Sequence, residues 1–228
     1  MLYSGKQIED FMQQGKFITL EGGEGTGKTT QAALLAKTLE QAGIPVLLLR
    51  SPGGTAVAEQ LRTILKTKTP GEDLLPETEL LLFGACHSQM CEYAVKPALA
   101  EGKWVICDRF FDSTTVYQGY VRGLPLETVE RINQFACRTI EPDLTLLLDI
   151  EPELGVRRAC GRNGGTIDEN DRFDSEGMAF HKAIRDSFLE RAKCFPERFR
   201  ILSAAGTIEE ISADIKKAVS DEFGLGII

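Results

Sequence analysis

Residues 17–31 read FITLEGGEGTGKTTQ, which is an apolar run followed by a glycine-rich loop and a helix-like run. The loop from Gly22 to Thr29 has the G-x-x-x-x-G-K-T spacing of a phosphate-binding loop. Its glycines let backbone N–H groups turn inward around phosphate oxygens, and the positive end of the following helix points at the same phosphates. A simple Gly-rich turn is the alternative interpretation. The strand-like run before the loop and the helix-like run after it favour binding of a nucleoside triphosphate.

The loop also predicts individual contacts to the nucleotide. We expect the Lys28 ammonium to lie near the β- and γ-phosphates and the Thr29 hydroxyl to bind Mg²⁺. The predicted nucleotide-binding residues are Gly22, Gly23, Glu24, Gly25, Thr26, Gly27, Lys28, Thr29 and Thr30.

The composition of the 228-residue chain is that of an ordinary globular protein, with 43% hydrophobic and 26% charged residues. Its net charge of −8 disfavours duplex nucleic acid and anionic membranes as main partners, so neither is expected. Six cysteines occur without a C-x-x-C pair, which favours reduced thiols and a cytoplasmic location. No apolar run approaches membrane-spanning length, and residues 1–6 lack the apolar core of a signal peptide.

Five short apolar runs, separated by helix-like sequence, predict a parallel β-sheet. They are residues 17–20, 45–49, 103–107, 144–148 and 199–202. The predicted fold class is therefore α/β, with a five-stranded parallel sheet wrapped by helices. We expect residues 1–15 to be an N-terminal extension and residues 16–228 to be a single phosphate-loop domain.

The sequence also contains signals for helix ends. Gly43 follows the first helix-like run, where glycine tolerates the left-handed conformation that ends many helices. Thr207 and Glu210 have the spacing of a capping box at the start of the last helix. Pro97 is expected to bend or shorten the helical stretch of residues 77–101.

Residues 157–165 begin helix-like and then become basic and Gly-rich, which breaks the α/β pattern. One interpretation is a solvated surface loop, and the other is a mobile lid that carries arginines over the transferred phosphate. Position favours a lid of about residues 157–172, because this segment follows the fourth strand, whose carboxyl end shares a sheet edge with the phosphate loop. Arg158 and Arg162 are four residues apart, which fits one face of a helix.

Asp108 directly follows the third apolar run, and Arg109 comes next. A carboxylate at this position either caps the next helix or reaches Mg²⁺, directly or through water. Arg109 favours the second interpretation, because a guanidinium offers two parallel donors to a phosphate at the same sheet edge.

Residues 108–119, DRFFDSTTVYQG, resemble the D-R-[YFH]-x-x-S-x-x-A-Y-Q-G signature of thymidylate kinases. The phosphate loop resembles the E-G-x-[ED]-G-x-G-K-[ST]-T motif of that family. Residues 50–55, RSPGGT, are similar to its R-E-P-G-G-T loop, and residues 171–174, DRFD, to its D-R-[IF]-E. Residues 81–83 match its L-L-F. The motifs occur in the family's order, and the resemblance covers about residues 16–220.

This resemblance implies that the protein is a phosphotransferase that moves the γ-phosphoryl group of ATP to dTMP, with Mg²⁺, in dTTP biosynthesis. In bacterial members with glycine after the acidic residue of the phosphate loop, as at Gly25, the catalytic arginines come from the lid. The implied catalytic residues are Lys28, Asp108, Arg109, Arg158 and Arg162, and the implied Mg²⁺ ligands are Thr29 and Asp108. The implied dTMP-binding residues are Glu24, Arg50, Phe83, His87, Arg109, Ser113, Thr114, Tyr117 and Gln118.

Two of these aromatic residues have a second interpretation. Phe83 would stack on the pyrimidine according to the resemblance, but it lies in an apolar helix-like stretch, and periodicity alone favours a core residue over a stacking platform. Tyr117 is ambiguous for a similar reason, because tyrosine commonly packs with its hydroxyl on a satisfied partner.

The chain departs from the family pattern at two places. Cys86 and His87 stand where the family has an Asp-Arg pair, whose arginine donates to the 4-keto oxygen of thymine. A neutral imidazole both donates and accepts, so His87 is less committed to a keto oxygen than an arginine would be. Ser51 replaces the glutamate of the R-E-P-G-G-T loop and removes a charge near the acceptor site.

These departures keep alternatives open. The chain could be a related kinase with relaxed or shifted pyrimidine monophosphate specificity, or a non-catalytic nucleotide-binding paralogue. The complete set of phosphate-binding residues argues against the non-catalytic paralogue. A GTPase-like switch is disfavoured because the chain lacks the guanine-reading N-K-x-D motif of such proteins. The family also implies a homodimer, for which the apolar helices of residues 77–100 and 112–140 offer a face.

Overall fold

The computed structural model of the protein describes residues 15–162 and 177–226. Within these residues the sheet has five parallel strands in the order β2-β3-β1-β4-β5. They are β1 (Phe17–Glu21), β2 (Val46–Arg50), β3 (Trp104–Asp108), β4 (Leu144–Asp149) and β5 (Phe199–Ser203). Each strand overlaps one of the five predicted apolar runs, so the predicted fold class is confirmed.

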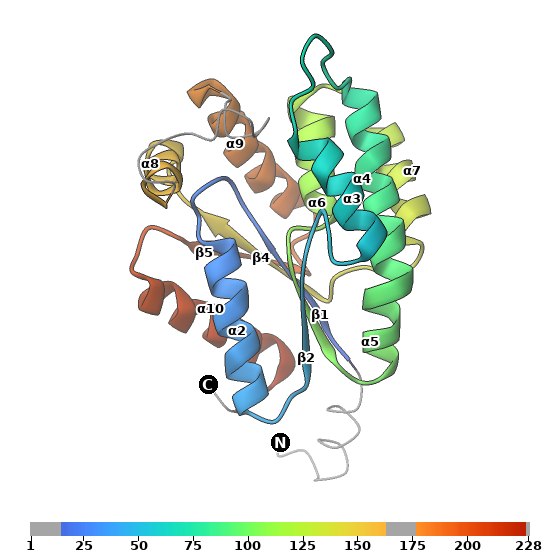
Figure 1. The fold of residues 1–228 in the computed structure, drawn as a ribbon. Helices are drawn as coiled ribbons and strands as arrows, with labels where there is room; N and C mark the ends of the chain where they lie inside the picture. The colour runs from blue at the N-terminus through green and yellow to red at the C-terminus, as the bar shows by residue number, and fades with distance from the viewer. Residues whose placement is uncertain (1–14, 163–176, 227–228) are drawn as a thin grey trace.

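Helices cover both faces of the sheet (Figure 1). One face carries α2 (Lys28–Gln41) and α10 (Ile208–Phe223), which pack on each other and on the strands. The other face carries the π-helix η1 (Cys91–Val95), α5 (Lys96–Ala100), the π-helix η2 (Thr115–Val121), α7 (Leu126–Cys137) and α9 (Met178–Cys194). The remaining helices are α3 (Ala56–Lys66), α4 (Pro76–Met90), α6 (Phe111–Thr114) and α8 (Pro152–Arg162).

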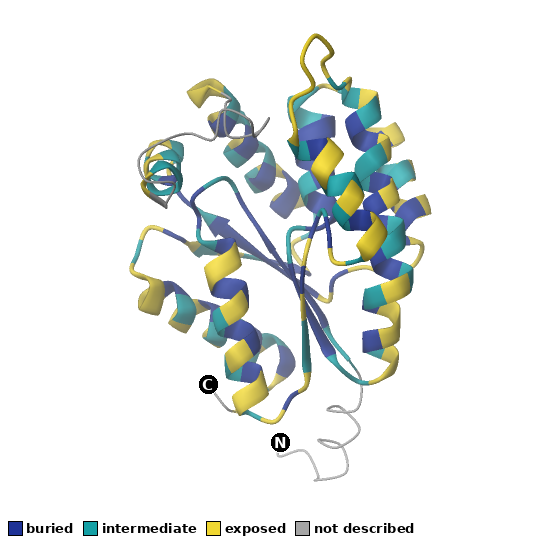
Figure 2. Cartoon of the chain, in the orientation of Figure 1, coloured by how far each residue is buried: buried dark blue, intermediate teal, exposed yellow. Residues whose placement is uncertain are grey.

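The strands lie between two apolar layers. Successive side chains of a strand point to opposite faces, so Phe17 joins the core under α5 while Ile18 and Leu20 join the core under α2 and α10. The central strands β1, β3 and β4 are accordingly buried, whereas the edge strands β2 and β5 are partly exposed and the helices expose their outer sides (Figure 2). Burial on both faces explains why the sequences of the central strands are continuous apolar runs rather than alternating ones.

The predicted helix ends are confirmed. Gly43 follows α2 with a φ of 82°, in the left-handed region that favours glycine. At the start of α10 the Glu210 amide donates to the Thr207 hydroxyl oxygen, and the Thr207 amide donates to the Glu210 carboxylate.

The long helical stretch before β3 is interrupted at η1, one turn before Pro97. Here the Lys96 amide donates to the Cys91 carbonyl, five residues back. The helix then continues through Pro97 to Ala100, so the proline does not end it. A second π-helix, η2, contains the whole Thr-Val-Tyr-Gln-Gly segment of residues 115–119, and single π-helical turns are frequent at functional sites.

The carboxyl ends of the parallel strands meet at one edge of the sheet. Asp108 lies in register with Leu20 on β1 and with Arg50 on β2. The phosphate loop, Arg50, Asp108 and the start of α8 therefore share this edge, as predicted. Most of the expected lid, the 171–174 motif and all but the last residue of the expected N-terminal extension lie outside the described residues.

Among the helices that the structure describes, none has both the length and the apolar character that a membrane crossing requires.

Candidate active site

The phosphate loop needs glycine at position 25 because α8 packs directly against it. Gly25 has a φ of 69°, and a Cβ built on it would lie 1.8 Å from the Gly155 carbonyl oxygen of α8. A Cβ on Gly155 would in turn lie 2.4 Å from the Glu24 carbonyl oxygen. The two glycines therefore allow the first turns of α8 to touch the phosphate loop, and a side chain at either position would separate them.

Lys28, which also lines the cavity described below, is buried at the mouth of this loop. Its ammonium donates to the carbonyl oxygens of Gly22, at 3.2 Å, and Gly23, at 2.6 Å, and to the Thr26 hydroxyl oxygen at 3.2 Å. Burial, followed by repulsion from Arg109, lowers the pKa of Lys28 to about 8. These partners are all neutral, so the positive charge stays available to phosphate oxygens.

Thr29 and Asp108 come together from two elements. The Thr29 hydroxyl, in the first turn of α2, donates to the Asp108 carboxylate at the end of β3. Oxygen ligands of this kind suit Mg²⁺, which proteins usually bind through one or two carboxylates together with substrate phosphates. The described residues contain no group of three or more acidic, histidine or cysteine side chains placed to hold a metal ion. Thr29 and Asp108 thus bring two oxygen ligands that suit Mg²⁺ to the mouth of the phosphate loop.

Arg109 follows Asp108 with a φ of 69°, a left-handed conformation that is uncommon for a non-glycine residue. Its guanidinium donates to the Gly22 carbonyl oxygen and the Ser113 hydroxyl oxygen, both at 3.0 Å, and to the Glu24 carboxylate at 2.9 Å. It also lies over the Tyr117 ring, 5.3 Å from the ring centroid. These contacts place a fixed positive charge beside the phosphate loop.

Glu21 holds the backbone that bends at Arg109. One carboxylate oxygen accepts from the Phe110 amide at 2.8 Å and the other from the Ser113 hydroxyl at 2.6 Å. Burial, and then the nearby Asp112, raise the pKa of Glu21 to about 7. Glu21 is not among the predicted site residues, although an acidic residue that ends an apolar strand is a signal that could have identified it.

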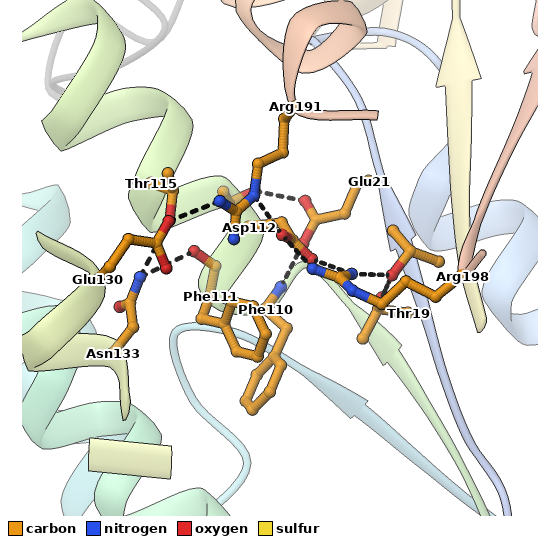
Figure 3. Close-up of polar contacts among 12 residues, drawn as sticks. Thr19, Glu21, Phe110, Phe111, Asp112, Thr115, Glu130, Asn133, Arg191 and Arg198 are labelled. Atoms are coloured by element: carbon orange, nitrogen blue, oxygen red, sulfur yellow. Dashed lines mark hydrogen bonds and ion pairs between the residues drawn. The ribbon is translucent and has the colours of Figure 1, made fainter. Parts of the chain in front are cut away.

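A buried ionic cluster of Asp112, Glu130, Arg191 and Arg198 lies beside this bend (Figure 3). The Asp112 carboxylate accepts from Arg191 at 2.8 Å and from two nitrogens of Arg198 at 2.7 and 2.8 Å. Arg191 also donates to Glu130 at 2.5 Å. The cluster joins α6 to α9 and to the loop before β5. No local sequence pattern indicates it, because its members are far apart in the chain.

A cavity of about 240 Å³ opens beside these groups. It is lined by Glu24, Gly25, Gly27, Lys28, Thr29, Arg50, Ser51, Pro52, Arg62, Lys66, Phe83, Asp108, Arg109, Phe110, Ser113, Thr114, Tyr117 and Gln118. All of the predicted dTMP-binding residues except His87 are among them. Phe83 both lines the cavity and packs against a small apolar cluster, so its two interpretations describe the same side chain.

The cavity also contains two basic residues that the sequence analysis missed. Arg62 and Lys66 lie four residues apart on α3, which places them on the same face of that helix. The Arg62 guanidinium donates to the Pro52 carbonyl oxygen at 2.7 Å. Their spacing of four residues, shortly after the loop of residues 50–55, is the sequence signal that could have identified them.

His87 does not line the cavity. It is fully buried, and its Nε2 lies 2.9 Å from the Ser51 hydroxyl oxygen, which does line the cavity. Burial lowers the pKa of His87 to about 4, so its ring is neutral near pH 7. Cys86 is also buried, and its thiol faces the Ala58 carbonyl. The two departures from the family pattern, at positions 51 and 87, are therefore in contact with each other.

Arg158 is turned away from the cavity. Its guanidinium donates to the carbonyl oxygens of Ala204, Ala205 and Gly206, at 2.6, 2.9 and 3.2 Å, in the loop between β5 and α10. Arg162 is the last residue of α8, and its side chain lies outside the described part of the chain. The structure thus brings Lys28, Asp108 and Arg109 together but does not bring Arg158 to them.

The parallel sheet, the phosphate loop and the adjoining cavity define a phosphate-loop kinase of the nucleoside monophosphate kinase fold. Comparison with known proteins gives the family. The family model for thymidylate kinase matches residues 20–215, and the chain belongs to that family.

Individual relatives agree with this assignment. The thymidylate kinase of Oleidesulfovibrio alaskensis is 46% identical over 212 residues, which cover 92% of this chain and 100% of the relative. The thymidylate kinase of Desulfosudis oleivorans is 45% identical over 198 residues, which cover 86% of this chain and 92% of the relative. The crystal structure of thymidylate kinase from Ehrlichia chaffeensis superimposes with a TM-score of 0.72 at 32% identity, covering 91% of this chain and 99% of that one.

Proposed function

We propose that this protein transfers the γ-phosphoryl group of ATP to dTMP and so produces dTDP and ADP. The observation that carries the proposal is that Lys28, Asp108 and Arg109 meet Phe83 and Tyr117 around one cavity. A cavity with cationic groups at one part of its wall and aromatic rings at another suits a phosphorylated nucleoside. The membership of the thymidylate kinase family supports dTMP as that nucleotide.

In the proposed reaction the phosphate loop binds the donor phosphates. Its amides and Lys28 neutralise charge on the β- and γ-phosphates as the bond to the leaving oxygen lengthens. Thr29 and Asp108 would hold Mg²⁺, which supplies further positive charge to the phosphate oxygens when it is bound. Because Asp108 and Thr29 already contact each other, both side chains are in place before the nucleotide arrives.

Arg109 is proposed to bind the acceptor phosphate. Its guanidinium is fixed by Glu24, Ser113 and the Gly22 carbonyl, so the acceptor phosphate meets an oriented donor. The attacking phosphate oxygen of dTMP is already anionic near pH 7, and the reaction therefore needs no strong general base. Positioning and positive charge are expected to supply most of the rate acceleration.

The lid arginines remain part of the proposal. Arg162 stands at the end of α8, and α8 touches the phosphate loop through Gly155 and Gly25. A shift of this helix would move Arg162 relative to the donor phosphates. Arg158 would have to leave three carbonyl oxygens to take part, so Arg162 is the better proposed source of a transition-state arginine.

We further propose that the protein acts in the cytoplasm as a homodimer. All six cysteines are free thiols, which suits a reducing compartment. Large apolar side chains are exposed on the same group of helices that the family resemblance implicates: Leu81 on α4, Tyr93 on η1 and Phe135 on α7, with Phe135 87% exposed. Light scattering of the wild type and of Phe135→Glu tests the dimer, which the charge is expected to weaken.

The activity is tested by ADP production from Mg·ATP with dTMP, dUMP, UMP, CMP, dCMP, AMP and GMP as acceptors. We expect a strong preference for dTMP. A Lys28→Met preparation, purified in parallel, measures any contaminating kinase. Absence of turnover with every acceptor, in protein that still binds ATP, would overturn the proposal.

A further inference from the structure

Ser51 and His87 form a polar pair at the wall of the cavity. The Ser51 hydroxyl oxygen lies 2.9 Å from His87 Nε2, and both residues are buried, with Ser51 5% exposed. His87 is four residues after Phe83 on α4, so the two side chains leave the helix on the same face. Ser51 and Phe83, whose ring is proposed to stack on the base, both line the cavity.

The direction of this hydrogen bond follows from the second nitrogen of His87. Among the described residues, Nδ1 has no hydrogen-bond partner and is buried. Because the ring is neutral, one nitrogen carries a hydrogen and the other a lone pair. A buried N–H without an acceptor is costlier and rarer than an acceptor without a donor. The hydrogen therefore sits on Nε2, and His87 donates to the Ser51 oxygen.

This direction determines what Ser51 offers to a ligand. Its oxygen accepts from His87, and His87 is the only hydrogen-bond partner of the hydroxyl among the described residues. The Ser51 amide is separately engaged, donating to the Asp108 carbonyl oxygen at 2.9 Å. The hydroxyl hydrogen is thus left to point into the cavity, where it requires an acceptor.

We propose that the Ser51 hydroxyl, oriented by His87, donates the hydrogen bond by which the cavity selects a pyrimidine with a 4-keto oxygen over one with a 4-amino group. This inference rests on the proposed function and names the specificity of the same site. A 4-amino group would place donor against donor and leave both unpaired. Ser51 is then a specificity-determining residue, and His87 is a positioning residue that acts through it.

The experiment uses two nucleotides that differ at C4 of the base, dTMP and 5-methyl-dCMP. The preference is the ratio of kcat/KM for dTMP to kcat/KM for 5-methyl-dCMP. Ser51→Ala is expected to reduce this preference by roughly 10–100-fold, the usual cost of an unpaired buried polar group. The loss should appear in the KM for dTMP more than in kcat, because Ser51 touches the base and not the phosphates.

Two variants of His87 test its positioning role. His87→Gln keeps an N–H donor at a similar reach, and it is expected to retain most of the preference. His87→Met keeps the bulk but cannot donate, so it should lose the preference as Ser51→Ala does. Ser88→Ala, next to His87 on α4 and outside the cavity lining, is the control that should match the wild type.

Each contrary outcome has a distinct meaning. An unchanged preference in Ser51→Ala would overturn the inference, even if His87→Met lost activity through misfolding. Loss of the preference in Arg62→Met but not in Ser51→Ala would assign the donor to Arg62 instead. If the wild type did not phosphorylate dTMP, the proposed function would fail, whereas the inference would still be decided by calorimetric binding of the same two nucleotides to Ser51→Ala and wild type.

Discussion

The phosphate-loop lysine and the buried ionic cluster are both removed from solvent, yet their partners differ in kind. Lys28 is held by neutral carbonyl and hydroxyl oxygens. Asp112 is held by the guanidinium groups of Arg191 and Arg198 (Figure 3). A phosphate can replace neutral oxygens around a cation and gain charge attraction, but nothing replaces two guanidiniums around a carboxylate without loss. Burial alone therefore does not distinguish Lys28 from Asp112, whereas the charge of their hydrogen-bond partners does.

Removal of the Lys28 ammonium should impair catalysis strongly and stability little. Lys28→Ala should lower kcat/KM for ATP by about 10³ or more, because the variant lacks the positive charge that stabilises the transferring phosphoryl group. Its free energy of unfolding should change little, since no charged partner is left alone. Steady-state kinetics and urea unfolding of the same preparation measure both quantities. A large loss of stability with an unchanged kcat/KM would contradict the distinction.

Removal of the Asp112 carboxylate should have the opposite pattern of effects, with a large loss of stability and a smaller loss of catalysis. Asp112→Ala should lower the free energy of unfolding by about 3–5 kcal/mol, because it leaves Arg191 and Arg198 buried without their carboxylate. The kcat of the protein that remains folded should fall far less than in Lys28→Ala. Glu127→Ala, which breaks an exposed ion pair with Arg131, is the matched control and should change stability much less.

Glu21 combines features of Lys28 and Asp112, because it is a buried carboxylate beside Asp112 whose hydrogen-bond partners, the Phe110 amide and the Ser113 hydroxyl, are neutral. Its pKa is raised from 4.5 to about 7, so its neutral form is the one the fold favours. The stabilisation from this proton is complete below about pH 4.5 and is lost as the pH rises through about 7. Glu21→Gln is neutral throughout and should reduce the loss of stability between pH 5 and pH 8. Identical pH dependence of unfolding in both proteins would refute this role of Glu21.

Much of the fold was predictable because its signals are local. Five apolar runs, the phosphate loop and the capping box at Thr207 each depend on residues that are neighbours in the chain. The two π-helices were not predicted, since a widened turn such as Thr115–Val121 follows from packing rather than from a distinct periodicity. The same packing lets the helix continue past Pro97.

The residues of the candidate site also divide into those that local motifs predict and those that only the folded chain brings together. Motif residues such as Lys28 and Asp108 were found because their spacing carries the chemistry, and the sheet edge brings them together. The contact between Ser51 and His87 joins residues 36 positions apart, and the sequence marked each only as a separate departure. Their relation is a property of the folded chain, as is the approach of Gly25 to α8.

A titration of the Lys28 side chain by NMR, with and without a non-hydrolysable Mg·ATP analogue, tests whether Lys28 is a phosphate-binding charge rather than a structural one. In the free protein the pKa of Lys28 should lie near 8, because the ammonium is buried among neutral oxygens and faces Arg109. With the analogue bound it should rise by more than one unit, since phosphate oxygens favour the charged form. A pKa that stays near 8 in the complex would show that the phosphates do not reach Lys28, and would contradict the account.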